Sequence, residues 1–245
     1  MRSAQRKRGQ GRQPVESGAA SVAAAKAQGL DLPKLQRNTL NEAVYQQLKQ
    51  ALMSGRIAPG STMTIRSLAS SFGVSLMPVR EALRRLVAEH VLVLQPNRSV
   101  ALPVITRERF REITRIRTSL EGLAVEEAAA HLTRAEIDRL DALNRAIERP
   151  GASRSPDYLI NNREFHFTIY RRSEMPTLLS IIESLWVQIG PLLTIQQRIY
   201  SKAPDQAQLH HRRALRALRR RDGAQARAAI AADIQDAAEI IAEHL

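Results

Sequence analysis

The sequence predicts a mainly α-helical protein, in which three helices and a β-hairpin precede an all-α antiparallel helical bundle. Aromatic residues make up only 4% of the 245 residues, and glycine and proline number 11 each, a composition that disfavours a sandwich or barrel. Apolar residues recur at helical spacing through most of the chain after residue 38, and β-branched runs typical of strands are confined to residues 91–104. These observations together indicate packed helices with one small sheet.

Composition excludes several classes of site. The chain has no cysteine, which rules out disulfides, thiolate zinc sites, iron–sulfur clusters and cysteine nucleophiles. No run of apolar residues reaches the roughly 18 that a membrane span needs, so we expect a cytoplasmic protein without a membrane partner. The basic Arg6-Lys7-Arg8 is followed by a weakly hydrophobic alanine run, which matches a secretory signal poorly, although an organelle transit peptide stays an alternative.

Positive charge is concentrated at the front of the chain. The net charge is +13, of which residues 1–38 carry +6, residues 39–105 carry +4 and the long remainder carries +3. Low hydrophobicity predicts that residues 1–38 form a basic disordered tail. Such asymmetry suggests a polyanionic partner for the front of the chain, with a merely solubilising tail as the alternative.

Residues 39–105 predict a compact DNA-binding fold. Thr39 to Glu42 form a capping box for a first helix that Gly55 ends, Thr64 caps a second helix that ends at Gly73, and Ser75 caps a third. In the third helix Val79, Leu83 and Leu86 share an apolar face while Arg80, Arg84 and Arg85 point outward. Residues 91–94 and 100–104 then read as a two-stranded hairpin. The unit is therefore predicted to be a winged helix-turn-helix.

Three motifs in this unit resemble the GntR family of bacterial transcription regulators. They are residues 54–60 (Ser-Gly-Arg-Ile-Ala-Pro-Gly), residues 68–75 and residues 78–86 (Pro-Val-Arg-Glu-Ala-Leu-Arg-Arg-Leu). The resemblance implies a dimeric, ligand-responsive regulator that binds an inverted-repeat DNA operator. Leu76 and Met77 stand where many members have Arg-Thr, so the operator should differ from the commonest one, and His90 replaces a common glycine.

Five residues are candidates for DNA contact. Arg80 lies one turn into the third helix, where a guanidinium suits guanine O6 and N7 in the major groove. The resemblance places Arg66 and Ser75 at phosphate-contacting helix starts, and Asn97 and Arg98 at the tip of the wing. The alternative for each is a solvated surface residue.

Residues 106–245 predict the all-α bundle. Helical periodicity covers residues 107–131, 134–149, 156–172, 176–200, 206–221 and 223–244, with capping signals at Thr133, Ser155 and Asp205. The run resembles the FCD domain of the FadR-like subfamily, notably in Arg117-x-x-x-Glu121, in Phe165-His166 and in the spacing of His211, Asp222 and Ala226. The resemblance implies that this domain binds a small effector.

Four polar residues lie on apolar helical stripes and are predicted to meet: Asn162, His166, His211 and Asp233. A buried carboxylate needs a partner, and two imidazoles, a carboxylate and an amide oxygen suit a divalent metal ion such as Zn, Mn or Ni. The resemblance points to the same positions, although Asn162 replaces an Asp and Asp233 replaces a His. The alternative is a polar core network without metal.

Arg117 is the candidate for binding the effector. It lies on the inner face of the first bundle helix and resembles the family's arginine that meets an effector carboxylate, which favours small organic acids. The alternative is an ion pair with Glu121. We expect the whole chain to act as a repressor. A metalloenzyme with an attached DNA-binding module is an alternative, although no motif for hydrolysis or phosphate binding supports an enzyme, and a purely architectural DNA-binding protein is another.

Overall fold

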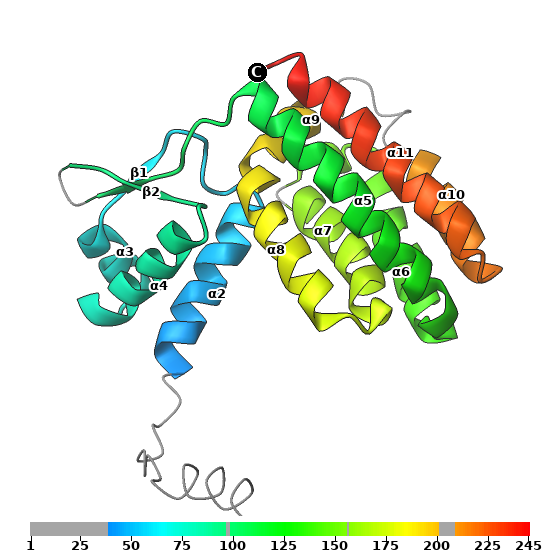
Figure 1. Ribbon diagram of the computed structural model, residues 1–245, viewed down its shortest axis with the longest axis horizontal. Helices are drawn as coiled ribbons and strands as arrows, with labels where there is room; N and C mark the ends of the chain where they lie inside the picture. The colour runs from blue at the N-terminus through cyan, green and yellow to red at the C-terminus, as the bar shows by residue number, and fades with distance from the viewer. Residues whose placement is uncertain (1–38, 97–98, 156, 201–208) are drawn as a thin grey trace, which may run out of the picture. The chain divides into compact units, whose positions relative to one another are not determined.

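The computed structural model describes residues 39–96, 99–155, 157–200 and 209–245 (Figure 1). The predicted basic tail, the candidates Asn97 and Arg98, and the helix start at Asp205 lie outside the described residues. All structural statements below concern the described part of the chain.

Residues 39–101 form three helices and a small sheet. The helices are α2 (Thr39–Met53), α3 (Ile65–Phe72) and α4 (Leu76–Ala88), and the strands are β1 (Thr62–Met63), β2 (Val93–Leu94) and β3 (Val100–Ala101). The sheet is antiparallel in the order β1-β3-β2, so the expected hairpin gains a third strand. A two-residue strand has no alternating pattern that would predict it from sequence.

The ends of α3 follow the predicted capping residues, whereas the start of α4 does so only in part. Thr64 forms a capping box with Ser67 at the start of α3, and Gly73 ends that helix with φ 63°. Ser75 occupies the N-cap of α4, but its side chain makes no capping hydrogen bond. At the other end of α4, His90 has φ 58°, a left-handed conformation that is unfavourable without glycine.

Residues 107–242 form the helical bundle. Its helices are α5 (Arg107–His131), α6 (Arg134–Glu148), α7 (Asp157–Tyr170), α8 (Pro176–Ile189), α9 (Leu193–Tyr200), α10 (Leu209–Arg219) and α11 (Gly223–Ala242), with short 3₁₀ turns η1 (Ala152–Arg154), η2 (Arg171–Ser173) and η3 (Gly190–Leu192). Thr106 and Asp222 cap α5 and α11 through their side chains, and Thr133 forms the predicted capping box with Glu136. Helix α11 lies alongside α5 (Figure 1).

The single helix predicted for residues 176–200 is interrupted at Gly190 and Pro191. Pro191 cannot donate a backbone hydrogen bond, and Gly190 lies against the end of α2. A Cβ atom at Gly190 would stand 2.5 Å from the backbone oxygen of Leu52 and 2.6 Å from Cα of Met53. The interruption therefore comes with a close contact between the bundle and the DNA-binding fold. Nearby, Lys49 of α2 donates to Glu183 of α8 at 2.8 Å.

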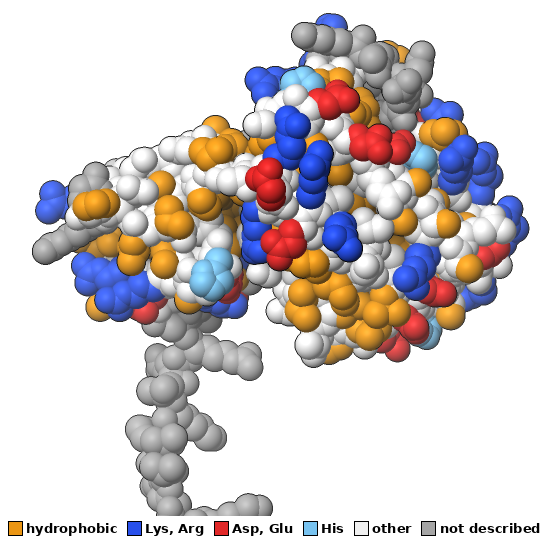
Figure 2. Space-filling view, turned by 45° about the horizontal axis from the view of Figure 1, so that its top comes forward, with side chains coloured by type: hydrophobic (Ala, Val, Ile, Leu, Met, Phe, Trp, Pro, Cys, Tyr) orange, Lys and Arg blue, Asp and Glu red, His pale blue; other side chains and the backbone are white. Residues whose placement is uncertain are grey.

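The expectation that no stretch is apolar enough for a membrane span needs correction. By length and composition alone, the helical run Pro176–Tyr200, with its 3₁₀ turn at Gly190–Leu192, meets that test. Its side chains Ile182, Trp186 and Ile189 are buried in the core of the bundle. A buried core helix of a soluble protein passes the same test, so this run is only weak evidence for a membrane-spanning helix. Figure 2 shows one face of the molecule, on which acidic and basic side chains are interspersed with hydrophobic ones.

Candidate DNA-reading surface and candidate metal centre

Helix α4 presents one arginine that no described group engages. Arg84 pairs with Glu81 at 3.1 Å, and Arg85 pairs with Glu42 and Glu89 while its guanidinium lies 3.6 Å from the centre of the Tyr45 ring. Arg80 is exposed, and its side chain makes no hydrogen bond or ion pair with any described residue. Among the arginines of α4, Arg80 is therefore the one available to a partner.

The start of α4 is also open to a partner. Ser75 is exposed and its hydroxyl is not used as a cap, and Arg66 of α3 is exposed without a side-chain partner among the described residues. Leu76 and Met77 keep 44% and 57% of their surface exposed. Apolar side chains in such a position suit the methyl group of thymine.

In the bundle, three of the four predicted polar residues meet. His166 of α7, His211 of α10 and Asp233 of α11 each offer one ligand atom, and all three atoms lie within 4.8 Å of one another. Nε2 of His166 lies 3.4 Å from Nε2 of His211 and 3.4 Å from Oδ2 of Asp233, and Nε2 of His211 lies 3.7 Å from Oδ1 of Asp233. Both histidines are buried, and the Asp233 side chain is 16% exposed.

These separations fit a small metal ion. Ligands at about 2.1 Å from a tetrahedral ion lie about 3.4 Å apart, which is close to the distances between the three residues. Asn162 lies one helical turn before His166 on the same face of α7 and is half-buried. Its amide oxygen as a fourth ligand stays a prediction from the sequence, and the donor set of imidazole and carboxylate suits Zn, Mn or Ni.

The charge states of the cluster favour cation binding. Burial lowers the pKa of His211 from its ordinary 6.5 to about 4, against the attraction of Asp233. Burial acts to raise the pKa of Asp233, but His211 and His166 outweigh it and the pKa falls to about 2. At neutral pH the site therefore holds a neutral imidazole at His211 beside a carboxylate at Asp233.

A chain of buried hydrogen bonds indicates which tautomer neutral His166 adopts. The Tyr170 hydroxyl donates its single hydrogen to Glu121 at 2.6 Å, because Glu121 is paired with Arg117 and can only accept. The contact of 3.1 Å between Tyr170 and Nδ1 of His166 then requires Nδ1 to be the donor. In neutral His166 the lone pair is therefore on Nε2, the atom that faces His211 and Asp233.

Arg117 forms an ion pair with Glu121, which was the alternative to effector binding in the sequence analysis. It is buried, and it donates from Nε to Glu121 at 2.6 Å and from Nη2 at 3.4 Å. Its guanidinium also lies 5.0 Å from the Trp186 ring. The pairing with Glu121 leaves Nη1 as the nitrogen that an additional acceptor would use.

Sequence analysis missed several polar groups around the cluster. His210, the neighbour of His211 on α10, is also buried and contacts Asp236 at 2.6 Å. Nδ1 of His211 and Nε1 of Trp186 are buried without a hydrogen-bond partner among the described residues. Tyr170 was detectable, since it follows His166 by four residues on α7, whereas the approach of Trp186 depends on how helices pack.

Two family comparisons match most of the described chain. Residues 40–102 match the bacterial regulatory proteins of the gntR family, and residues 112–236 match the FCD domain. The chain belongs to the GntR family and carries an FCD domain. It is a ligand-responsive transcription regulator with a winged helix-turn-helix for DNA and a helical effector domain, and not an enzyme, so the metalloenzyme alternative is wrong.

Individual relatives agree with this assignment. The HTH-type transcriptional regulator McbR of Escherichia coli is 36% identical over 159 residues, covering 64% of this chain and 72% of McbR. The gluconate operon transcriptional repressor of Bacillus subtilis is 26% identical, covering 74% and 76% of the two chains. The solved structure of E. coli McbR/YncC matches with a TM-score of 0.75 at 32% identity, covering 84% of this chain and 98% of that one.

Proposed function

We propose that this regulator is a repressor that binds an inverted-repeat operator as a homodimer and releases it in response to a small organic acid. Residues 39–105 read DNA, residues 106–245 sense the acid, and the protein acts in the bacterial cytoplasm, where its operator is. The observation that carries the proposal is the buried cluster of His166, His211 and Asp233 in a domain attached to a DNA reader. A divalent metal ion, held there with Asn162, would neutralise Asp233 and offer open positions to a carboxylate.

The operator-reading residues are supported by their availability. Arg80 has no partner to lose among the described residues, and it lies on the helix that enters the major groove in this fold. Arg66 and Ser75 are exposed at helix starts, where backbone N–H groups favour phosphate. Asn97 and Arg98, at the predicted wing tip, are proposed as further DNA contacts on the basis of the sequence alone.

The effector class is supported by the polar groups around the cluster. Nη1 of Arg117 and the unpartnered Nδ1 of His211 and Nε1 of Trp186 are nitrogen atoms that a carboxylate or hydroxyl group of a ligand would satisfy. The name of one relative, the gluconate operon repressor, adds support for a sugar acid or a related hydroxy acid, and for repression.

Helix α8 provides a route from the effector site to the DNA reader. Trp186 of α8 lies 5.4 Å, between ring centres, from His166. One turn earlier on the same helix, Glu183 pairs with Lys49 of α2. A ligand that moves Trp186 therefore shifts an element that contacts the DNA-binding fold, which is the kind of shared two-state element that coupling needs.

Selection of bound sequences from a random DNA pool tests the operator proposal. We expect an inverted repeat, and we expect Arg80→Ala to weaken binding to it by about 1–3 kcal/mol and to relax preference at one base pair per half-site. Arg84→Ala is the matched control, since Arg84 is exposed on the same helix but paired with Glu81. If Arg80→Ala loses the same affinity for the selected sequence and for random DNA, Arg80 does not contact a base.

A further inference from the structure

A small pocket lies where the DNA-binding fold meets the helical bundle. Its volume is about 140 Å³, and its lining comes from α2, α7 and α8, with Arg171 from η2. The pocket is separate from the candidate metal centre, because none of His166, His211 and Asp233 lines it. A molecule bound in it would touch both domains.

Positive side chains outnumber negative ones in the lining of this pocket. The cationic side chains are Lys49, Arg163 and Arg171. The anionic ones are Glu164 and Glu183, so one positive charge is left over. Glu164 is also shared between two cations, since it lies 2.7 Å from Arg163 and 3.6 Å from Arg171. The charge of the lining therefore favours an anion.

Two of the cationic groups are buried and have unused donors. Lys49 is 7% exposed, and its ammonium group, which carries three hydrogens, donates to one described acceptor, Oε2 of Glu183 at 2.8 Å. Nε of Arg163 is buried and has no hydrogen-bond partner among the described residues. Buried donors without acceptors are costly, above all on charged groups. Both groups line the same pocket, so we expect an acceptor bound there to serve both.

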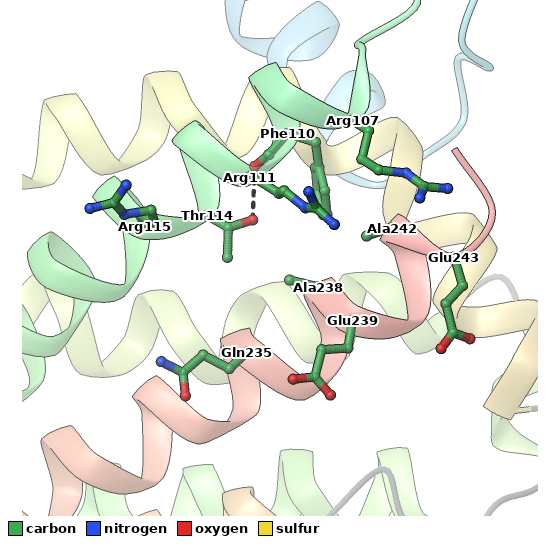
Figure 3. A pocket seen from close by; sticks show the side chains of 10 residues that line it. All are labelled: Arg107, Phe110, Arg111, Thr114, Arg115, Gln235, Ala238, Glu239, Ala242 and Glu243. Atoms are coloured by element: carbon green, nitrogen blue, oxygen red, sulfur yellow. Dashed lines mark hydrogen bonds between the residues drawn. The ribbon is translucent and has the colours of Figure 1, made fainter.

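The larger groove between α5 and α11 has no such buried donors among its charged side chains. Figure 3 shows Arg107, Arg111 and Arg115 extending from α5, and Glu239 and Glu243 extending from α11. All five side chains are exposed, so water hydrates their charges and little is lost when they stay unpaired. Burial of the donors, rather than the size of the hollow, distinguishes the pocket beside Lys49.

The size and polarity of the pocket indicate its ligand. A water molecule takes up about 30 Å³ in the liquid, so the pocket has room for an ion of about five heavy atoms. Inorganic phosphate has that size, and its oxygens accept several charge-assisted hydrogen bonds at once. At neutral pH phosphate also keeps a hydroxyl group, which can donate to Glu164 or Glu183, whereas sulfate has no hydrogen to donate. We propose that this pocket is a phosphate-binding site in which Lys49 and Arg163 hold the anion.

Bound phosphate would connect the DNA-binding fold to the bundle. Lys49 belongs to α2, and Arg163 belongs to α7, the helix that also carries His166. An anion that needs both cations binds only while the two helices are close, so it stabilises that arrangement over others. The phosphate site is thus a second means of control, which does not depend on the metal ion or on the organic acid.

Calorimetric titration of the full-length protein with phosphate tests the site. The buffers are matched in ionic strength with chloride, and the protein is treated with a chelator so that no metal ion competes for phosphate. We expect the wild type to bind phosphate, and Lys49→Gln and Arg163→Gln each to weaken binding at least about tenfold, because each loses a charge-assisted hydrogen bond. The rise in Tm that phosphate causes should shrink in the same two variants. Since phosphate also stabilises proteins non-specifically, the difference from the wild type is the measure.

Arg139→Gln is the matched control. Arg139 of α6 lies 3.7 Å from Glu164 but does not line the pocket, so the same loss of charge should leave phosphate affinity unchanged. A wild type that does not bind phosphate overturns the proposal, and so do two pocket variants that bind phosphate as the wild type does, or an equal loss in Arg139→Gln. Sulfate bound as tightly as phosphate would overturn the choice of phosphate as the ligand.

Discussion

Tyr170 and Glu121 prepare the candidate metal centre without contributing a ligand. Glu121 is completely buried and accepts from both Arg117 and Tyr170. This arrangement orients Tyr170 so that it accepts from Nδ1 of His166 and leaves Nε2 free to bind a cation. We therefore expect the affinity of the proposed metal site to depend on the Tyr170 hydroxyl group.

Replacing Tyr170 with Phe should weaken metal binding by about 10–100-fold, as is typical for groups that orient a ligand. We expect the wild type to bind about one Zn, Mn or Ni ion per chain, and competition with a chelator measures the affinity of both proteins. Tyr45→Phe is the control, because its hydroxyl also donates to a glutamate, Glu89, but in the DNA-binding fold. Equal affinities for all three proteins would contradict the proposed role.

The lowered pKa of His211 predicts a dependence of stability on pH. In the unfolded chain the His211 side chain has its ordinary pKa of 6.5, whereas in the folded protein its pKa is about 4. The metal-free protein should therefore lose stability as the pH falls from about 6.5 towards 4. Asp233 adds a separate loss below its ordinary 3.8, since its folded pKa is about 2. Denaturant titrations at pH 7 and pH 4.5 should show a smaller loss in His211→Gln, and an unchanged loss would contradict the assignment.

At the residue scale, the sequence predicted which side chains meet and missed how they are held. His166 and Asp233 each lie on an apolar stripe, so helical spacing alone places them inside the bundle. The bond from Tyr170 to Glu121 joins residues 49 positions apart, and helical spacing within one segment carries no information about it. Arg117 pairs with Glu121, one helical turn away, as the alternative in the sequence analysis stated.

At the element scale, local signals predicted helices well where capping residues stand at their ends. Helix α5 covers the expected residues 107–131, with Thr106 as its cap. The run 176–200 was predicted as one helix because its apolar pattern is continuous, yet it is interrupted where α2 approaches Gly190. Gly190 and Pro191 are local helix-breaking signals that the continuous apolar pattern outweighed in the prediction, whereas the approach of α2 at the same point depends on a contact between distant segments that helical periodicity does not report.

Gly190→Ala should destabilise the protein, although alanine favours helices. The φ of Gly190 is −48°, so alanine gains roughly 0.5–1 kcal/mol from reduced flexibility. Its Cβ would stand 2.5 Å from the Leu52 backbone oxygen, and such overpacking costs about 1–3 kcal/mol. We expect a net loss in the free energy of unfolding. Ser180→Ala, at an exposed position of α8, should cause no such loss, and a stabilised Gly190→Ala would show that α2 is not held there.

At the scale of the whole molecule, the effector and the operator must influence each other equally. Both bind one chain in which α8 contacts the metal cluster and α2, and binding free energies at coupled sites are reciprocal. If a sugar acid or hydroxy acid weakens operator binding by some factor, saturating operator DNA must weaken binding of that acid by the same factor. Couplings of this kind are typically about 1–3 kcal/mol.

Calorimetry of the metal-loaded protein with a panel of hydroxy acids, keto acids and sugar acids, with and without operator DNA, measures both factors. His211→Ala should abolish the response to the acid while leaving operator binding without acid largely unchanged, because His211 lies in the bundle and Arg80 in the DNA reader. The proposed switch requires the two factors to agree. An acid that binds with the same affinity in the presence and absence of operator DNA would show that the bundle senses a ligand without controlling the winged helix.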